Sequence, residues 1–344
     1  TMEASRRELL PAIKTYVKGS QMTSFELSLG IAERTGNLNR QGVPCFLGSQ
    51  PAQGAADLAG ADVAIIGVPF VSPLIGFEND LAPRKVRIAG LAYISSYVPE
   101  LEIDPGAALR IVDYGDVDFP FGDTSAANAA VQAAISEVVA GGYLPVTIGG
   151  NAPASSFAVI NGITAQRPGS VGVISFDGHC DTAPDWGTEP NSSNWVLAAY
   201  EANPAMSRAN HVQIGLRGMN NRPVDMAYFR ENGMRTIMAR EARAMGSMAL
   251  AEAAVSRAVA GVDHLWLAVD LDVLDSSNTP DWDWPDPYGL VAGDILETAY
   301  LAGKSGKLCG VSLMMIGGNV ASVQRIAVWI IMYALAGYAE AKRG

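Results

Sequence analysis

The sequence predicts an α/β fold in three layers, α/β/α, with a single, mostly parallel sheet of about eight strands. Short apolar runs alternate with helical stretches along most of the chain, which is typical of a parallel sheet covered by helices on both faces. Several of the runs are apolar throughout instead of alternating, as expected of strands buried on both faces. Two of them end directly in clusters of acidic residues.

The eight strands are expected at apolar runs bounded by Gly, Pro, Asn and Asp. A helix is expected to begin near Ala82, and Thr124 can cap a second helix that extends through Ala140. Pro153 follows two glycines and suits the first turn of another helix. Two further helices are expected at 247–260 and around 326–337. The predicted strands are 62–69, 109–112, 144–148, 171–176, 211–216, 235–238, 265–269 and 308–314.

The pattern divides the chain into two parts. Residues 1–60 are predicted to be an N-terminal extension that contacts a neighbouring subunit or covers the site. They begin with a helical pattern at 3–17 and continue with sequence rich in Gly, Asn and Gln. Residues 61–344 show no linker, repeat or low-complexity tract. They are therefore predicted to form one large α/β domain, which a chain of this length allows.

Composition restricts the partners and the compartment. The net charge of −11 and the pI near 4.8 argue against binding to nucleic acid or to an anionic membrane. The cysteines Cys45, Cys180 and Cys309 form no disulfide pattern, which favours the cytoplasm. The longest apolar run, 326–337, is too short to span a bilayer, and no signal peptide is visible.

Two predicted strands end in groups of potential metal ligands. One group is Asp177, His179 and Asp181, and the other is Asp270 and Asp272. Both are expected in the crevice at the carboxyl edge of the sheet. Carboxylates that converge there repel one another unless a divalent cation is bound. The alternative is two unrelated acidic turns.

Cys180 lies inside the first of these groups. It could act as a nucleophile, or it could be a bystander thiol. No other histidine is close in sequence to activate it, which favours the bystander interpretation.

Residues 177–181 and 270–275 resemble the D-A-H-x-D and D-x-D-x-x-D motifs of the ureohydrolases, the family of arginase and agmatinase. The resemblance extends from about residue 62 to 336. It implies an arginase-like fold with two bridged manganese or nickel ions, which generate a hydroxide that attacks a guanidinium carbon. Further matches are Gly115-Asp116, Gly215, Arg217 and the Pro-rich loop at 280–290.

The resemblance also implies roles for individual residues. One ion position would keep a complete set of four ligands, and the other would keep three carboxylates. Asp181 and Asp286 are the implied catalytic residues, with Asp286 in place of the usual Glu that holds the guanidinium. The implied metal ligands are Asp177, His179, Asp181, Asp270 and Asp272.

Besides Asp286, the chain departs from the family pattern at three places. Ala152 stands where the family has a ligand histidine, and residues 191–195 lack the histidine that shuttles protons. Met315 stands near the position of a late Glu. Because acid–base help is worth roughly 10²–10⁴-fold, the chain alone is expected to bind one ion or none and to be weakly active or non-catalytic.

These features lead to one leading hypothesis for the function, a hydrolase subunit, and to two alternative functions. The first hypothesis is a subunit of a guanidino- or biguanide-hydrolase complex of the metformin hydrolase type, releasing urea or a related product. Its partners would be a homologous catalytic chain and copies of itself, assembled as a hexamer. One alternative is a stand-alone agmatinase-like hydrolase with a modified metal centre. The other is a one-metal, deacetylase-like amide hydrolase that uses Asp177, His179 and Asp270. A structural protein without an ion is also considered.

Overall fold

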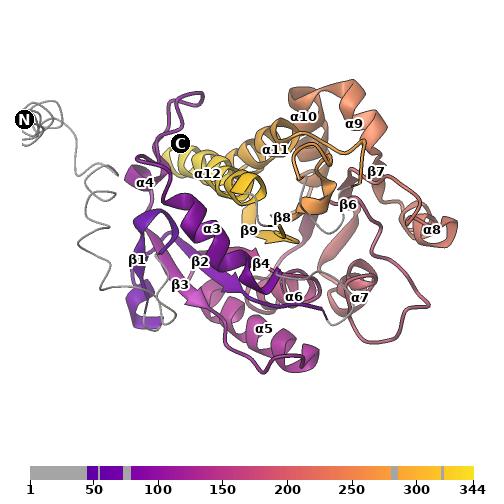
Figure 1. Ribbon diagram of the computed structural model, residues 1–344, viewed down its shortest axis with the longest axis horizontal. Coiled ribbons are helices and arrows are strands. Elements are labelled where there is room, and N and C mark those ends of the chain that lie inside the picture. Colours follow the sequence, from indigo (N-terminus) through magenta and orange to yellow (C-terminus); the bar gives the residue numbers. More distant parts are fainter. Residues whose placement is uncertain (1–44, 53–54, 73–78, 280–285, 319–320) are drawn as a thin grey trace, which may run out of the picture.

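The sheet has nine strands, all parallel, and carries the whole architecture (Figure 1). The computed structural model describes residues 45–52, 55–72, 79–279, 286–318 and 321–344. The strand order is β1-β3-β2-β4-β9-β8-β5-β6-β7. The strands are β1 (Gln50–Pro51), β2 (Val63–Val68), β3 (Ile111–Asp116), β4 (Leu144–Gly149), β5 (Val171–Phe176), β6 (Met206–Ile214), β7 (Arg235–Ile237), β8 (His264–Asp270) and β9 (Leu308–Met314).

Helices cover both faces of this sheet, so the predicted three-layer fold is confirmed. On one face α12 packs against both α3 and α11, and α11 packs against α10. On the other face α6 lies between α5 and α7. The helices are α3 (Ala82–Gly90), α4 (Pro105–Ala108), α5 (Thr124–Ala140), α6 (Phe157–Gln166), α7 (Trp195–Ala202), α8 (Pro223–Glu231), α9 (Ala239–Met245), α10 (Ser247–Ala258), α11 (Ala292–Lys304) and α12 (Ala321–Arg343).

The continuous apolar runs follow from burial on both faces. Strand β2 is buried along its whole length. Val63 and Ile65 belong to the core under α3 and α12, whereas Ala64 and Ile66 belong to the core under α5 and α6. Since successive side chains point to opposite faces, each strand contributes to both cores, and a polar residue on either face would lose the stabilisation of burial.

The eight predicted strands are all present, and the ninth, β1, is a two-residue edge strand that pairs with β3. Two local predictions were wrong. Asp123 and not Thr124 caps α5, because its Oδ1 accepts the Ala126 N–H at 2.9 Å. Pro153 does not open a helix, because its carbonyl accepts the Ser156 N–H in a turn and α6 begins only at Phe157.

The N-terminal extension predicted for residues 1–60 is only partly covered by the described residues. Residues 1–44, including the helix expected at 3–17, lie outside them. The described residues 45–52 and 55–60 include η1 (Phe46–Gly48), β1 and η2 (Ala55–Leu58). Phe46 is buried, and its N–H donates to the Asp113 carboxylate at 2.7 Å. This segment therefore packs on the sheet.

Helix α12 is longer than the apolar run that predicted it. Its 23 residues are long and apolar enough to cross a membrane by length and composition alone. However, 67% of its most apolar window is buried inside the fold. Burial of this kind is typical of a core helix, and α12 forms the centre of one helical layer.

Candidate metal centre

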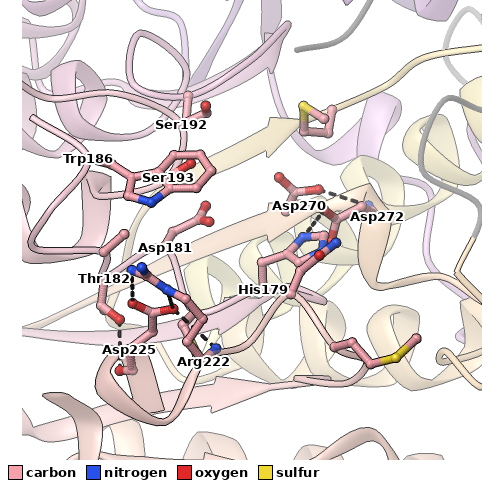
Figure 2. A pocket seen from close by; sticks show the side chains of 16 residues that line it. His179, Asp181, Thr182, Trp186, Ser192, Ser193, Arg222, Asp225, Asp270 and Asp272 are labelled. Carbon is pink, nitrogen blue, oxygen red and sulfur yellow. Dashed lines mark hydrogen bonds and ion pairs between the residues drawn. The ribbon is translucent and has the colours of Figure 1, made fainter. Parts of the chain in front are cut away.

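The register of the sheet brings the two acidic groups together. Strands β5 and β8 are adjacent and parallel, and Phe176 pairs with Val269. Asp177, which follows β5, therefore lies beside Asp270, which ends β8. Figure 2 shows that His179 and Asp181 lie in the same cavity as Asp270 and Asp272. The structure thus places all five sequence-predicted ligand residues in one cluster at the carboxyl edge of the sheet.

His179 and Asp272 form the tightest contact of this cluster. His179 Nδ1 lies 2.7 Å from one Asp272 oxygen, and the Gly178 N–H donates to the other at 2.8 Å. The Asp272 charge raises the pKa of His179 to about 9, although burial opposes the shift. Burial also acts to raise the pKa of Asp272, but His179 and the Gly178 N–H outweigh it and the pKa is lowered.

Asp177 and Asp270 carry negative charge that the chain does not neutralise. Asp177 is buried, its Oδ1 accepts the His179 N–H at 2.6 Å, and its Oδ2 has no hydrogen-bond partner. Burial, followed by the charges of Asp181, Asp272 and Asp270, raises its pKa well above the usual range. Burial and then Asp272 do the same to the pKa of Asp270.

Asp181 is held at the edge of the cluster by a residue that the sequence did not identify. Trp195 Nε1 donates to Asp181 Oδ2 at 2.7 Å. The backbone of Asp181 is left-handed, with φ of 50°, a conformation that is uncommon for a residue other than glycine. Burial raises the pKa of Asp181 to about 7, and His179 partly opposes the shift. No spacing pattern in the sequence connects Trp195 to the acidic groups.

These residues fit a divalent cation. Asp177, His179 and Asp272 each offer a ligand atom, and the three atoms lie within 4.8 Å of one another. The unpartnered Oδ2 of Asp177 is an acceptor that a cation would satisfy. A set of carboxylates with one imidazole suits manganese and similar ions. Asp270 lies next to this set, and its Oδ1 accepts the Asp272 N–H at 2.8 Å.

The corner formed by β4 and β9 lacks an imidazole. Ala152 lines the cavity and is 3% exposed, and Met315 lies beside it. The Met315 N–H donates to the Gly150 carbonyl at 2.9 Å, which holds the two loops together. Among the described residues that line the cavity, His179 is the one histidine.

Asp286 lies close to this cluster but does not line the cavity. Its charge contributes to the raised pKa of His179, after larger contributions from Asp272 and Asp181. Its carbonyl accepts a hydrogen bond from Arg217 Nη2 at 3.1 Å. Asp275, the last acid of the second motif, instead accepts the Ser277 N–H and holds a turn.

Arg217 holds the backbone at Asp272, Leu274 and Asp286. Its Nη2 donates to the carbonyls of Asp272 and Leu274 at 2.8 and 3.0 Å. Its Nη1 packs so closely against Gly178 that a Cβ there would lie 2.5 Å away. Glycine at 178 therefore allows the Arg217 guanidinium to approach the segment that carries the metal ligands. A motif match alone does not show this packing requirement.

Cys180 is no nucleophile candidate in this setting. Its thiol is buried, and its Sγ lies 3.2 Å from Met226 Sδ. Burial, followed by the charges of Asp181 and Asp225, raises its pKa above the usual value. The thiol is therefore protonated at neutral pH, whereas the thiolate is the reactive form.

The cavity continues from the acidic cluster to a polar and aromatic rim. Its volume is about 340 Å³. Trp186, Ser192 and Ser193 come from the loop between β5 and α7, and Arg222 and Asp225 come from the start of α8. Figure 2 shows Arg222 beside Asp225, across the cavity from His179 and Asp272. Ser192 and Ser193 belong to 191–195, where the resemblance places the missing proton shuttle, whereas Trp186, Arg222 and Asp225 were not predicted. The spacing Arg-Pro-x-Asp, typical of a helix start, was the sequence signal for Arg222 and Asp225.

Comparisons with known proteins agree with this fold. The model of the arginase family matches residues 61–335. A formimidoylglutamase of Halobacterium salinarum is 28% identical over 242 residues, which cover 70% of this chain and 75% of the relative. A guanidinopropionase of Pseudomonas aeruginosa is 30% identical over 258 residues, which cover 73% of this chain and 77% of the relative.

A solved structure shows the same fold. The crystal structure of Trypanosoma cruzi formiminoglutamase with Mn²⁺ matches with a TM-score of 0.74 and 24% identity, covering 86% of this chain and 99% of that one. The family match spans most of the described domain, including both acidic strand ends that form the metal cluster. The chain therefore belongs to the arginase family.

Proposed function

We propose that the chain is a metal-dependent hydrolase of C–N bonds in guanidino or amidino compounds, releasing urea or a related product. The observation that carries the proposal is the convergence of Asp177, His179, Asp270 and Asp272 in one buried cluster. The names of the relatives, formimidoylglutamase and guanidinopropionase, support this class of substrate.

The implied cofactor is a divalent metal ion, with manganese preferred because the T. cruzi structure contains it, and nickel as the alternative. Asp177, His179, Asp270 and Asp272 would hold it. A divalent ion there supplies Lewis-acid polarisation and lowers the pKa of water. Asp181 is proposed to accept a proton at the cavity wall, and Asp286, which lies near the cluster without lining the cavity, to attract the positive charge of the amidine group at longer range.

One observation favours a role inside a complex. Ala152 occupies the buried corner where the family resemblance places a second ligand histidine. The chain is therefore proposed to hold only one ion tightly and to work slowly on its own. It would assemble with copies of itself and with a homologous catalytic chain, as in the metformin hydrolase type of complex.

Metal analysis and turnover of the purified chain test these proposals. After loading with Mn²⁺ or Ni²⁺, one tightly bound ion per chain and measurable urea or ammonia release from guanidino acids, agmatine or metformin are expected. His179→Ala should lose the ion and the activity. Arg235→Gln, at an exposed ion pair away from the cavity, is the matched control.

The outcomes separate the alternatives. Turnover that increases strongly with a co-purified homologous chain supports the complex, and brisk turnover by the isolated chain supports a stand-alone enzyme. Release of acetate from acetylated amines would identify a deacetylase-like enzyme instead. If the chain neither binds a metal nor shows turnover, with or without the partner, that result contradicts the hydrolase proposal.

A further inference from the structure

We infer that Arg222 determines substrate specificity by binding a carboxylate, so that the cavity prefers guanidino or amidino acids to amines of similar length. This inference rests on the proposed function and names its substrate class. Arg222 is the only Lys or Arg among the described residues that line the cavity. In Figure 2 it lies beside Asp225, on the other side of the view from His179, Asp270 and Asp272.

One side of the Arg222 guanidinium is fixed by the fold. Nε and Nη2 donate to the Asp225 carboxylate at 2.9 and 2.8 Å. Asp225 is buried, with its side chain 6% exposed, and it also accepts the Arg222 N–H at the start of α8. Because Asp225 also accepts the N-cap N–H as the third residue of the helix, this carboxylate holds the guanidinium in place at the cavity wall.

The other side of the guanidinium has an exchangeable partner. Nη1 and Nη2 donate to Asp185 at 2.9 and 2.6 Å, in a bidentate pair. The Asp185 side chain is 60% exposed and lies in the loop between β5 and α7. An exposed ion pair contributes little net stability. A ligand carboxylate can therefore replace Asp185 with the same bidentate geometry, which arginine is suited to provide.

The charge pattern of the cavity favours a ligand with opposite charges at its two ends. One end is lined by Asp181, Asp270 and Asp272, which attract a guanidinium or amidinium group. Without Arg222 the other end would carry the Asp185 and Asp225 carboxylates and would attract an ammonium group. With Arg222 in place, a ligand carboxylate that displaces Asp185 meets a guanidinium that Asp225 alone still pairs, and is the complementary group.

Binding of two matched ligands tests the inference. 4-Guanidinobutyrate and agmatine share the guanidino group and have similar length, but end in a carboxylate and an ammonium group. Calorimetry on chelator-treated protein measures their affinities without turnover, and KM and kcat of the metal-loaded protein provide a second readout. Arg222→Gln should weaken guanidinobutyrate binding roughly 10- to 100-fold and leave agmatine binding unchanged or tighter.

Three further variants make the test specific. Arg222→Lys keeps the charge without the planar fork and should restore part of the affinity for the acid. Asp185→Asn removes the competing carboxylate and should tighten binding of the acid several-fold. Arg235→Gln breaks a comparably exposed ion pair, in which the Arg235 and Glu241 side chains are 41% and 42% exposed. It should change the affinity for neither ligand.

The possible results are distinct. Equal weakening of both ligands in Arg222→Gln, or weaker binding of the acid in Asp185→Asn, overturns the inference. If the chain hydrolyses agmatine but neither binds nor hydrolyses guanidino acids, the proposed function stands and the carboxylate site falls. If no guanidino compound binds, both fall.

Discussion

Two groups of acids on the strands of the sheet are neutralised in different ways. In the middle of β3, Asp113 accepts two hydrogen bonds from the buried Arg87, both at 2.8 Å, and Asp116, the last residue of that strand, accepts a third. At the ends of β5 and β8, four aspartates share the single imidazole of His179. The Arg87 guanidinium pairs with both acids of the first group. In the second group the carboxylates outnumber the one imidazole that can neutralise them.

The difference separates a structural cluster from a binding cluster. Burial acts against the charge of Arg87, but Asp113 and Asp116 outweigh it and raise its pKa. In the other cluster burial and mutual repulsion raise the pKa of Asp177. A fold that pairs its acids in one place and leaves them in excess a few strands away has room for a cation from solution in the second place.

The largest effect is expected from removal of the internal cation. Arg87→Met leaves two acids beside an apolar group, one of them fully buried, and should lower the free energy of unfolding by about 3–5 kcal/mol. Urea denaturation measures this, with Arg235→Met as the exposed control, expected near 0–1 kcal/mol. The double variant Arg87→Met/Asp113→Asn should recover part of the loss. Equal losses for Arg87→Met and Arg235→Met would contradict the assignment.

Metal binding should stabilise the second cluster alone. At an ion concentration 100–1,000 times Kd, Mn²⁺ should raise the free energy of unfolding by about 3–4 kcal/mol. Asp272→Asn should abolish the gain, whereas Asp113→Asn should not. Thermal unfolding with and without chelator measures both. A similar gain in the Asp272→Asn variant would place the ion elsewhere.

The metal-free chain should respond to pH through the second cluster. The pKa of Asp181 is about 7 in the folded chain and near 4 when unfolded, so the folded state binds more protons between these values. Its contribution is present at low pH and is lost as pH rises from about 4 to 7, on the order of 4 kcal/mol. Asp181→Asn should flatten this part of the stability curve. An unchanged curve would show that burial of Asp181 has no such effect.

The smallest effect on stability, and the most informative for the site, is expected from Ala152→His. The added imidazole enters the corner beside Met315 and should allow a second ion to bind, as measured by metal analysis. Turnover should increase less than metal content, because 191–195 still supplies no histidine. Ala154→His, at a fully buried neighbour, is a control that should only destabilise the fold. Loss of the first ion in Ala152→His would argue against separate positions.

The sequence predicted the strands and the meeting of the two acid groups, because both follow from short-range pattern. A run such as 171–176 is buried on both faces, and parallel strands end at one edge, so Asp177 and Asp270 had to be near if β5 and β8 were neighbours. Contacts such as that of Trp195 with Asp181 were not predictable. They depend on the path of the loop between β5 and α7, which tertiary packing determines and local pattern does not.

The close approach of Arg217 to Gly178 has an evolutionary consequence. The motif that this chain resembles has alanine at the second position, where this chain has glycine. Here a methyl group would meet a guanidinium that four backbone carbonyls hold in place. Gly178→Ala is therefore not an independent step for this lineage. It becomes tolerable only after the loop that anchors Arg217 has moved, so the two positions are expected to change together or not at all.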